Sequence, residues 1–432
     1  MSSGQTKSMS NSFSALERQR DIYLQGLSGQ RSRVPSDPLA LETAAKKQMS
    51  PEAYAYVAGG AGVELTVQRN RTAFGQWQIQ PRMLRDVSQS DTGVTLFGRH
   101  LPAPILLSPV GVLDLCHRDA DLAVGRAAAK LGLPFIFSNQ ASVAMENVSQ
   151  VMGEGPRWFQ LYWSKSNELV ASLVQRAEAC GCEAIVVTLD TTMLGWRLRD
   201  LDLAYLPFLR GKGIAQYTSD PVFQAMLDEP EEEGLVSPKR KITWQTLKAI
   251  YQLLQNYPEP FFKNLRSGRP LRAVRQFINL YTKPSLNWDD LPFLREHTNL
   301  PIILKGIHHP EDARRAIDTG VDGLIISNHG GRQVDGAVST IEMLPSIKEA
   351  IGDQIPLLLD SGVRTGADVF KALALGANAI CIGRPYAYGL ALDGELGVAT
   401  VLQNLWADFE LTMRLSGCVK AEDINQEWLQ TS

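Results

Sequence analysis

The stretch GLIISNHGG, residues 323–331, decides the expected fold, because a continuous apolar run ends there in a histidine and two glycines. A short run that is apolar at every position is typical of a strand buried on both faces, as parallel strands are. Seven further runs share this design: APILLSPVG (103–111), PFIFSNQ (134–140), RWFQLYW (157–163), AIVVTLD (184–190), PIILKGI (301–307), IPLLLDSG (355–362) and AICIGRP (379–385). The sequence therefore predicts eight parallel strands.

Amphipathic stretches lie between most of these runs, and each ends at or near a glycine that can cap a helix. They include DADLAVGRAAAKLGL (119–133), NELVASLVQRAEACG (167–181), HPEDARRAIDTG (309–320) and RTGADVFKALALGA (364–377). Eight alternating strand and helix units predict a TIM (β/α)8 barrel. A doubly wound sheet would not require eight units, and it would usually carry a glycine fingerprint after its first strand.

Two segments lie outside the regular alternation. The first 100 residues predict a helical extension packed on the barrel, with a helix in SPEAYAYVAGG (50–60) that begins at Pro51 and ends at glycines. The barrel then spans residues 101–432. The spacing between the fourth and fifth runs predicts an insertion from about Leu201 to Ser285, much longer than an ordinary loop. Because loops after strands lie at the catalytic face of such barrels, this insertion is either an active-site lid or a surface elaboration or subunit contact.

Composition excludes several classes of function. The net charge of −3 supplies no basic excess for binding nucleic acid. The five cysteines form no C-x-x-C pair, and the adjacent His308 and His309 cannot easily share one ion, so we expect neither a disulfide framework nor a metal site. The polar N-terminus lacks the apolar core of a signal peptide, and no apolar run is long enough for a membrane span. These features predict a cytoplasmic protein without a membrane partner.

The candidate site residues follow the strands, since reactive side chains in TIM barrels lie at the carboxyl ends of strands. In chain order these positions are Pro109, Val110, Gly111, Ser138, Gln160, Tyr162, Thr188, Asp190, Lys305, Ser327, His329, Arg332, Asp360, Ser361, Gly362, Val363, Arg364, Gly383 and Arg384. DSGVR after the seventh strand and GRP after the eighth supply glycine N–H groups and arginines where barrels often bind phosphate. We therefore predict a phosphate group there.

Three residues suit acid–base chemistry on an anion. His329 can act as a base, Arg332 can hold a carboxylate beside it, and Asp190 can pair with the other ring nitrogen of the histidine. Lys305, on an otherwise apolar strand, would be a costly buried charge unless it faces an anion or an electron-rich ring. Tyr56, Tyr162 and Arg197 join this set if the early helix and the loop after the fourth strand fold over the site.

These motifs resemble those of the FMN-dependent L-2-hydroxy-acid oxidase and dehydrogenase family. The likeness runs from about Ala45 to Gly417 and rests on YVAGGAG, SPVGV, FQLYW, VTLDT, LKGI, SNHGGRQ, DSGVRTGADVFKALALGA and IGRPYAYG. SNHGGRQ and DSGVR, in this order, are the most specific of them.

The resemblance implies a role for each position. His329 would be the active-site base, Asp190 would orient it, and Lys305 would lie beside the flavin. Arg332, Arg197, Tyr56 and Tyr162 would bind the substrate. Residues 109–111, Ser138, Gln160, Tyr162, Thr188 and Ser327 would line the isoalloxazine ring, while residues 360–364, Gly383 and Arg384 would bind the ribityl chain and the phosphate.

Within the family, the long insertion, LGWR (194–197) and GIHHPEDARRA are most similar to lactate 2-monooxygenase, which converts lactate and O2 into acetate, CO2 and water. Gly111, where many members have alanine, would leave room for dioxygen beside the flavin. An L-lactate or 2-hydroxy-acid oxidase that releases keto acid and H2O2, a quinone-linked dehydrogenase and a catalytically silent FMN-binding protein remain alternatives. By analogy with the family, we expect a homo-oligomer, a tetramer or an octamer.

Overall fold

A closed barrel of eight parallel strands forms the centre of the computed structural model, which describes residues 13–229 and 243–431. The strands follow one another around the barrel in chain order. They are β4 (Ile105–Leu107), β5 (Phe135–Phe137), β6 (Arg157–Leu161), β7 (Ile185–Thr188), β8 (Ile302–Ile307), β9 (Gly323–Ile326), β10 (Leu357–Asp360) and β11 (Ala379–Ile382). Each matches one of the eight apolar runs, so the predicted TIM barrel is confirmed.

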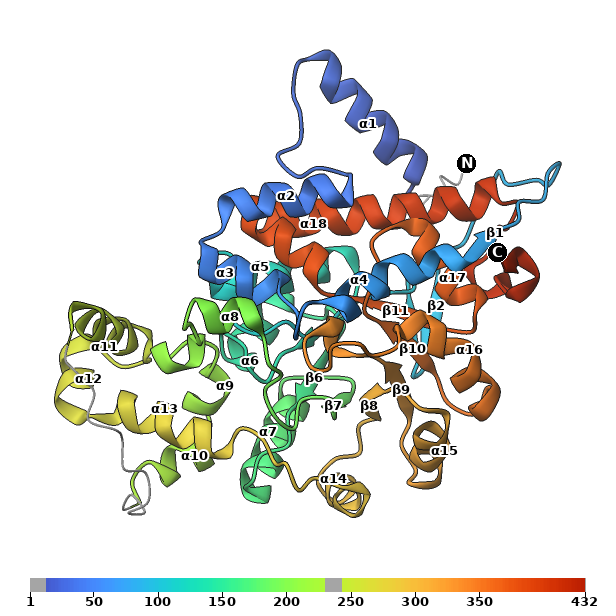
Figure 1. Cartoon of the computed structure of the whole chain (residues 1–432). Helices are drawn as coiled ribbons and strands as arrows, with labels where there is room; N and C mark the ends of the chain where they lie inside the picture. The colour runs from blue at the N-terminus through green and yellow to red at the C-terminus, as the bar shows by residue number, and fades with distance from the viewer. Residues whose placement is uncertain (1–12, 230–242, 432) are drawn as a thin grey trace, which may run out of the picture.

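Helices surround the strands, as Figure 1 shows. They are α5 (Ala120–Leu131), α6 (Met145–Met152), α7 (Asn167–Ala179), α14 (Pro292–His297), α15 (Pro310–Asp318), α16 (Thr340–Ile351), α17 (Gly366–Ala374) and α18 (Arg384–Leu415). Their apolar faces cover strands whose own side chains are almost completely buried, which places the hydrophobic core inside and around the barrel. Helix α18 is kinked at Asp393 and Gly394, where the backbone leaves the helical conformation.

The segment before the barrel contains α1 (Ala15–Leu27), α2 (Pro38–Gln48), α3 (Pro51–Ala58), α4 (Leu65–Thr72) and the strands β1 (Trp77–Ile79), β2 (Val94–Leu96) and β3 (Arg99–Leu101). The backbone N–H of Ala15 donates to the carboxylate of Glu410 on α18 over 2.8 Å. At the other end of the chain, β12 (Leu429–Thr431) pairs antiparallel with β1. Both ends of the described chain are therefore tied to the body of the protein.

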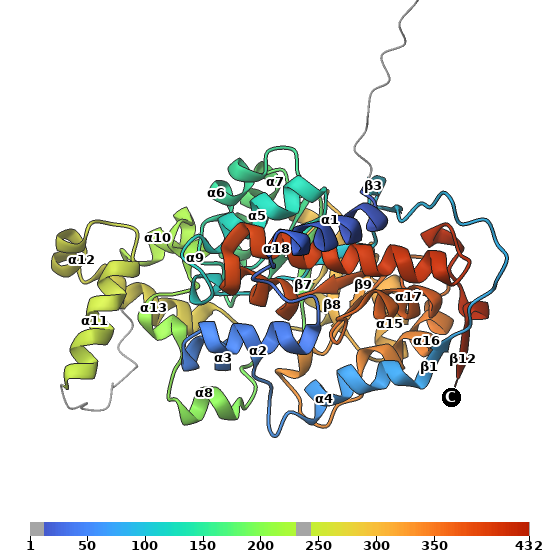
Figure 2. The ribbon, with the colours of Figure 1, turned by 90° about the horizontal axis from the view of Figure 1, so that it is seen from above.

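The described part of the insertion between β7 and β8 consists of short helices joined by turns. It contains α8 (Leu198–Asp202), a short helix at Pro207–Arg210, α9 (Ala215–Thr218), α10 (Pro221–Met226), α11 (Trp244–Asn256), α12 (Phe261–Ser267) and α13 (Arg269–Leu280). Both Figure 1 and Figure 2 show α11, α12 and α13 beside the barrel rather than over its strands. Residues 230–242 of the insertion and 1–12 of the N-terminal segment lie outside the described residues.

Candidate active site

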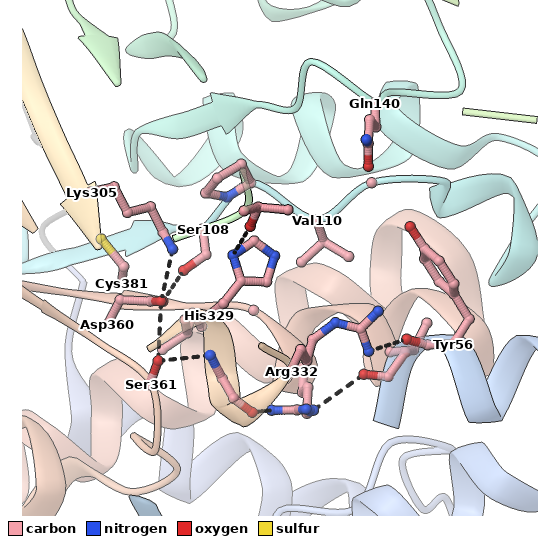
Figure 3. Close-up of a pocket in the computed structure, with 18 of the residues that line it drawn as sticks. Tyr56, Ser108, Val110, Gln140, Lys305, His329, Arg332, Asp360, Ser361 and Cys381 are labelled. Atoms are coloured by element: carbon pink, nitrogen blue, oxygen red, sulfur yellow. Dashed lines mark hydrogen bonds and ion pairs between the residues drawn. The ribbon is translucent and has the colours of Figure 1, made fainter. Parts of the chain in front are cut away.

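A single pocket collects most of the predicted site residues at the carboxyl ends of the strands. Its lining includes Tyr56, Pro109, Val110, Gly111, Tyr162, Arg197, Lys305, His329, Arg332, Asp360, Ser361, Gly362, Val363, Arg364, Gly383 and Arg384. The early helix α3 and the loop after β7 do fold over the barrel, because they deliver Tyr56 and Arg197. Figure 3 shows Lys305 and Asp360 on one side of His329, and Arg332 with Tyr56 on the other.

Five predicted residues lie behind this lining rather than in it: Ser138, Gln160, Thr188, Asp190 and Ser327. The side chains of Ser138, Gln160, Thr188 and Ser327 are buried at the ends of their strands. Asp190 follows β7 and contacts His329. Ser138 accepts from the backbone of Gln140, and Ser327 contacts both Lys305 and Asp360, so residues of this set hold lining residues in place.

His329 is held by an acidic partner. Its Nδ1 lies 2.9 Å from Oδ1 of Asp190 and 3.1 Å from the hydroxyl of Thr191, which in turn donates to Asp190. Since the ionised carboxylate can only accept, the ring proton resides on Nδ1 and leaves the lone pair on Nε2. This is the tautomer that a general base requires.

Burial keeps the imidazole of His329 neutral. Loss of solvent lowers the pKa of His329 below its ordinary value, while the charge of Asp190 acts against that shift. Burial also works to raise the pKa of Asp190, but attraction to His329 and Lys305 holds it below its ordinary value. The result is a neutral imidazole beside an ionised carboxylate.

The backbone around His329 turns sharply. His329 itself has φ 56°, and Gly330 and Gly331 follow with φ 66° and 76°. A Cβ on Gly330 would lie 2.7 Å from the guanidinium of Arg384, and one on Gly331 would lie 2.8 Å from Val67. Only glycine fits at both positions, and the left-handed conformation of His329 is the kind of local strain that accumulates at functional sites.

Two arginines, the buried Arg197 and the half-buried Arg332, form the positive side of the pocket. The guanidinium of Arg332 donates to the carbonyls of Tyr56 and Gly59 and lies over the ring of Tyr56, 5.1 Å from its centroid. Arg197 donates to the carbonyl of Arg332 over 3.1 Å and to the side chain of Gln333 over 2.9 Å. Burial, reinforced by repulsion from Arg197, lowers the pKa of Arg332 to about 10. Two cations this close and this buried favour a bound anion such as a carboxylate.

Lys305 sits in a buried ion pair rather than alone. Its ammonium lies 3.2 Å from the carboxylate of Asp360 and donates to Ser327 over 2.8 Å. The same carboxylate accepts from Ser108 and Ser327, each over 2.6 Å. Although burial opposes the charge, attraction to Asp360 and Asp190 raises the pKa of Lys305 above its ordinary value. Lys305 is therefore a permanent cation at the pocket wall.

The far end of the pocket suits a phosphate. Burial lowers the pKa of Arg364 to about 10, and within the described part of the chain no carboxylate forms an ion pair with this guanidinium. Gly383 lines the same pocket, and a Cβ at this position would lie 3.3 Å from the side chain of Val110. Arg384 is placed differently, because its guanidinium donates to the carbonyls of Val57, Gly59 and Gly330 and so ties α3 to the loop after β9.

These observations fit FMN. Nε2 of Gln160 and the hydroxyl of Thr188 are buried without a hydrogen-bond partner. This is expected of groups that bind the polar edge of a flavin ring. Lys305 supplies a cation near them, and Arg364 supplies one for the phosphate. The donor set therefore matches an aromatic, polar-edged ring joined to a phosphate.

Sequence reasoning missed several lining residues. Ser108, Cys381 and Ile382 belong to predicted strand ends and could have been found by the same rule, as could Val57 beside Tyr56 and Thr191 beside Asp190. Gln140, which lies across the pocket in Figure 3, follows Ser138. Leu194, Phe208 and Tyr281 come from the loop after β7 and from the insertion, where no positional rule applies. Among the described residues, no cluster of three or more His, Cys, Asp or Glu side chains is placed to hold a metal ion.

Comparison with known proteins gives a consistent result. The FMN-dependent dehydrogenase family matches residues 45–431. The chain is 40% identical to an L-lactate oxidase of Lysinibacillus sphaericus, over 94% of this chain and 95% of that protein. It is 37% identical to human 2-hydroxyacid oxidase 1, over 89% and 94% of the two chains.

Solved structures agree with the sequence comparison. A crystal structure of mandelate oxidase superposes with a TM-score of 0.73 at 34% identity, covering 92% of this chain and 99% of the other. In the described residues, no helix has the length and apolar character needed to cross a membrane. The matched span includes every predicted site residue, from Tyr56 to Arg384. The chain therefore belongs to the FMN-dependent dehydrogenase family, and its cofactor is FMN.

Proposed function

We propose that this protein oxidises L-lactate with O2 to acetate, CO2 and water, which is the reaction of a lactate 2-monooxygenase. Oxidation of a 2-hydroxy acid by an FMN enzyme is the chemistry that family membership and the site support together. The choice of lactate and the fate of oxygen are the finer parts of the proposal.

The substrate is bound by its carboxylate and its hydroxyl. Arg332 and Arg197 hold the carboxylate, since both cations line the pocket and the charge of Arg197 helps to lower the pKa of Arg332. Tyr56 and Tyr162 donate hydrogen bonds to the substrate, because burial raises the pKa of each phenol and keeps the proton on it. Fixing both groups places the second carbon beside His329.

His329 then removes a proton from the bound acid. Its Nε2 accepts the proton, and Asp190 stabilises the imidazolium that forms. Bound FMN supplies the acceptor for the two electrons that leave the substrate. Lys305 keeps a positive charge beside the ring, because Asp360 and Ser327 hold its ammonium in place.

The remaining predicted residues would hold FMN. Gln160, Thr188, Ser138, Ser327 and residues 109–111 line the ring in this proposal, and residues 360–364 with Gly383 and Arg384 bind the ribityl chain and phosphate. The unpartnered atoms of Gln160 and Thr188 support the first assignment, and the buried guanidinium of Arg364 supports the second.

One observation supports the monooxygenase over the simple oxidase: the insertion contributes Phe208 and Tyr281 to the pocket lining. A pocket closed on that side retains the keto acid while O2 is consumed. Pyruvate and H2O2 then give acetate, CO2 and water, with the bond between the first two carbons broken and one oxygen of O2 in acetate. Gly111 permits a close approach of the loop after β5, since a Cβ at this position would lie only 3.1 Å from Gln140.

The oxidase is the second candidate, because the relative that is 40% identical is named an L-lactate oxidase. It would release pyruvate and H2O2 as separate products. A quinone-linked dehydrogenase would transfer the electrons to a quinone instead of O2. A silent FMN-binding protein would keep the cofactor and turn over none of these acids.

Product analysis distinguishes these reactions. The FMN-loaded protein is supplied with L-lactate and 18O-labelled O2 in the presence of catalase, and the carbon products are identified by NMR and mass spectrometry. Acetate that carries one labelled oxygen is the expected result. Unlabelled pyruvate as the sole carbon product would establish the oxidase, turnover with a quinone in the absence of O2 would establish the dehydrogenase, and no turnover would support the silent protein.

Two further properties belong to the same proposal. We expect a cytoplasmic homo-oligomer, a tetramer or octamer, and no nucleic-acid partner, in line with the net charge of −3. Light scattering after size-exclusion chromatography measures the mass of the assembly directly. A monomeric mass of 47.6 kDa would contradict the oligomer.

A further inference from the structure

The insertion gives the pocket an aromatic end. Phe208 comes from the short helix at Pro207–Arg210, near the start of the insertion, and Tyr281 follows α13 at its other end. Both side chains line the same pocket as His329 and Arg332. Two segments that are distant in the sequence therefore meet at one wall.

The rings of this wall are fixed by packing. The Phe208 centroid lies 5.2 Å from Phe277 and 6.3 Å from Tyr281, and the rings of Phe277 and Tyr281 stack with centroids 4.9 Å apart. Tyr217 packs edge-on against Phe277 at 4.8 Å. Phe277 and Tyr217 are fully buried, so the two pocket-lining rings rest on a solid aromatic core.

The first part of the insertion is also anchored to the barrel. Lys212 forms an ion pair with Asp114, in the loop after β4. Gln216 accepts a hydrogen bond from the backbone of Met145 over 3.0 Å. Farther along, Asp220 accepts from Arg176 of α7 over 2.9 Å and is completely buried. These contacts join Phe208 and Tyr217 to the loops that surround the pocket, which makes this segment a wall rather than a loose cover.

The chemistry of a 2-hydroxy acid indicates what this wall contacts. The arginines and tyrosines of the pocket engage the carboxylate and the hydroxyl, so the third group on the second carbon, the side chain, needs an apolar surface. Phe208, Tyr281 and Leu194 supply such a surface in the lining. Tyr281 also lies near the carboxylate clamp, which is the pair Arg332 and Arg197. Burial raises the pKa of Tyr281, and the nearby charge of Arg197 opposes that shift.

We propose that Phe208 and Tyr281 determine which 2-hydroxy acids this protein accepts, because their rings close the end of the pocket that receives the substrate side chain. A methyl group fits against the two rings, whereas a phenyl group collides with them. The inference rests on the proposed oxidation of a 2-hydroxy acid, and it adds the substrate class: acids with a short alkyl side chain.

Equilibrium binding of two keto acids to the FMN-loaded protein tests the wall without turnover. Pyruvate carries a methyl group and benzoylformate a phenyl group, and calorimetry measures the dissociation constant of each. We expect the native protein to bind pyruvate at least tenfold more tightly than benzoylformate. In Phe208→Ala and in Tyr281→Ala this preference falls by about tenfold or more, as removal of a contacting group from an apolar pocket does.

Matched variants distinguish the effect of the aromatic wall on binding from general effects of a substitution. Phe262→Ala removes the same ring from α12, where the side chain is 76% exposed, and it should leave both dissociation constants unchanged. Tyr281→Phe keeps the ring and removes the hydroxyl, so it should retain the preference for pyruvate. Thermal unfolding identifies any misfolded variant, and Phe208→Leu then replaces Phe208→Ala as a smaller change that should relax the preference in the same direction.

The outcomes are distinct. Equal binding of pyruvate and benzoylformate by the native protein would overturn the inference, and so would an unchanged preference in folded Phe208 and Tyr281 variants. Failure of the proposed function is recognised separately: the native protein would then give pyruvate instead of acetate from lactate, whatever its binding preference. Failure of both keto acids to bind at all would reject the proposed substrate class together with the inference.

Discussion

Nδ1 of His329 lies 2.9 Å from Oδ1 of Asp190, and the two residues come from the ends of different strands of the barrel, β9 and β7. The contact settles which ring nitrogen carries the proton. It also places a negative charge behind the imidazole, so that a proton taken up at Nε2 is stabilised without a change in the position of the ring. The barrel thus brings together the two side chains that we propose as the base and its orienting acid.

Replacement of Asp190 tests that pairing. In Asp190→Asn the amide can donate to Nδ1, which moves the ring proton to Nε2 and removes the base from the pocket. We expect kcat to fall by about 10²–10⁴-fold, the usual contribution of a general base. Stopped-flow absorbance of FMN after mixing with L-lactate without O2 measures the chemical step alone.

His329→Gln should have a similar effect on that step while FMN stays bound, because His329 holds the substrate side of the pocket in our proposal. Normal turnover by this variant would reject His329 as the base. Retention of FMN is read from the visible spectrum after gel filtration, so loss of cofactor is recognised as a separate event.

The low pKa of His329 predicts the pH dependence of the reaction. The base must be neutral, and burial lowers its pKa below the ordinary histidine value of about 6.5. The value of kcat/KM should therefore be level from that pH upward, until Arg332 loses its charge near its pKa of about 10. At lower pH it should decline, as the imidazole becomes protonated. Because the charge of Asp190 raises this pKa, Asp190→Asn should move any residual acid limb to still lower pH; a limb at higher pH would contradict the pairing.

Exchange of one cation for another tests the carboxylate clamp. Arg332→Lys keeps a positive charge but loses the planar fork that reaches the carbonyls of Tyr56 and Gly59. We expect KM for L-lactate to rise and kcat/KM to fall by roughly 10²-fold, with Arg332→Met at least as severe. Arg69→Met is the matched control, since Arg69 is paired with Glu342 at the surface and its substitution should leave KM unchanged.

The buried carboxyl group of Asp121 predicts how the stability of the protein depends on pH. Burial raises the pKa of Asp121 to about 7, although its carboxylate accepts from the backbone of Ser142 and Val143. The folded state therefore binds more protons than the unfolded state between about pH 4, the ordinary value for aspartate, and pH 7, and the contribution of this group to stability is lost as pH rises through that window.

Asp121→Asn should remove this loss, because the amide oxygen still accepts and cannot ionise. Denaturant unfolding at pH 5 and pH 7 measures how much the free energy of unfolding changes between the two pH values. This change should be smaller in the variant than in the native protein by on the order of 1.4 kcal/mol per pH unit. Asp119→Asn, whose side chain is 45% exposed, serves as the control. An identical pH dependence in Asp121→Asn and the native protein would refute the assignment.

The barrel and most of the pocket could be predicted from the sequence because each depends on a local pattern. Runs such as GLII end in the residues that reach the pocket, and the rule that links strand ends to the catalytic face located Lys305, His329 and Asp360. The same rule located Gln160 and Thr188, but the structure puts their side chains behind the residues that line the pocket, because strand position alone does not specify which side chain is covered by its neighbour.

Phe208 and Tyr281 could not be found in this way. They lie in an insertion whose described residues form no strand. Their approach to the pocket depends on packing between residues such as Phe277 and Tyr217 and on the ion pair of Lys212 with Asp114. Such contacts join segments far apart in the chain and leave no periodic signal in the sequence. Only the folded structure identifies Phe208 and Tyr281 as pocket-lining residues.

The arrangement separates two properties of the protein along its chain. The proposed base, the carboxylate clamp and the flavin contacts lie outside residues 201–285, whereas Phe208 and Tyr281 of the aromatic wall both lie within this insertion. A chimera that receives this stretch from a relative would therefore inherit a new choice of acid while keeping the original reaction. Exchange of the insertion alone, in the laboratory or in evolution, would therefore change the substrate while the barrel stays the same.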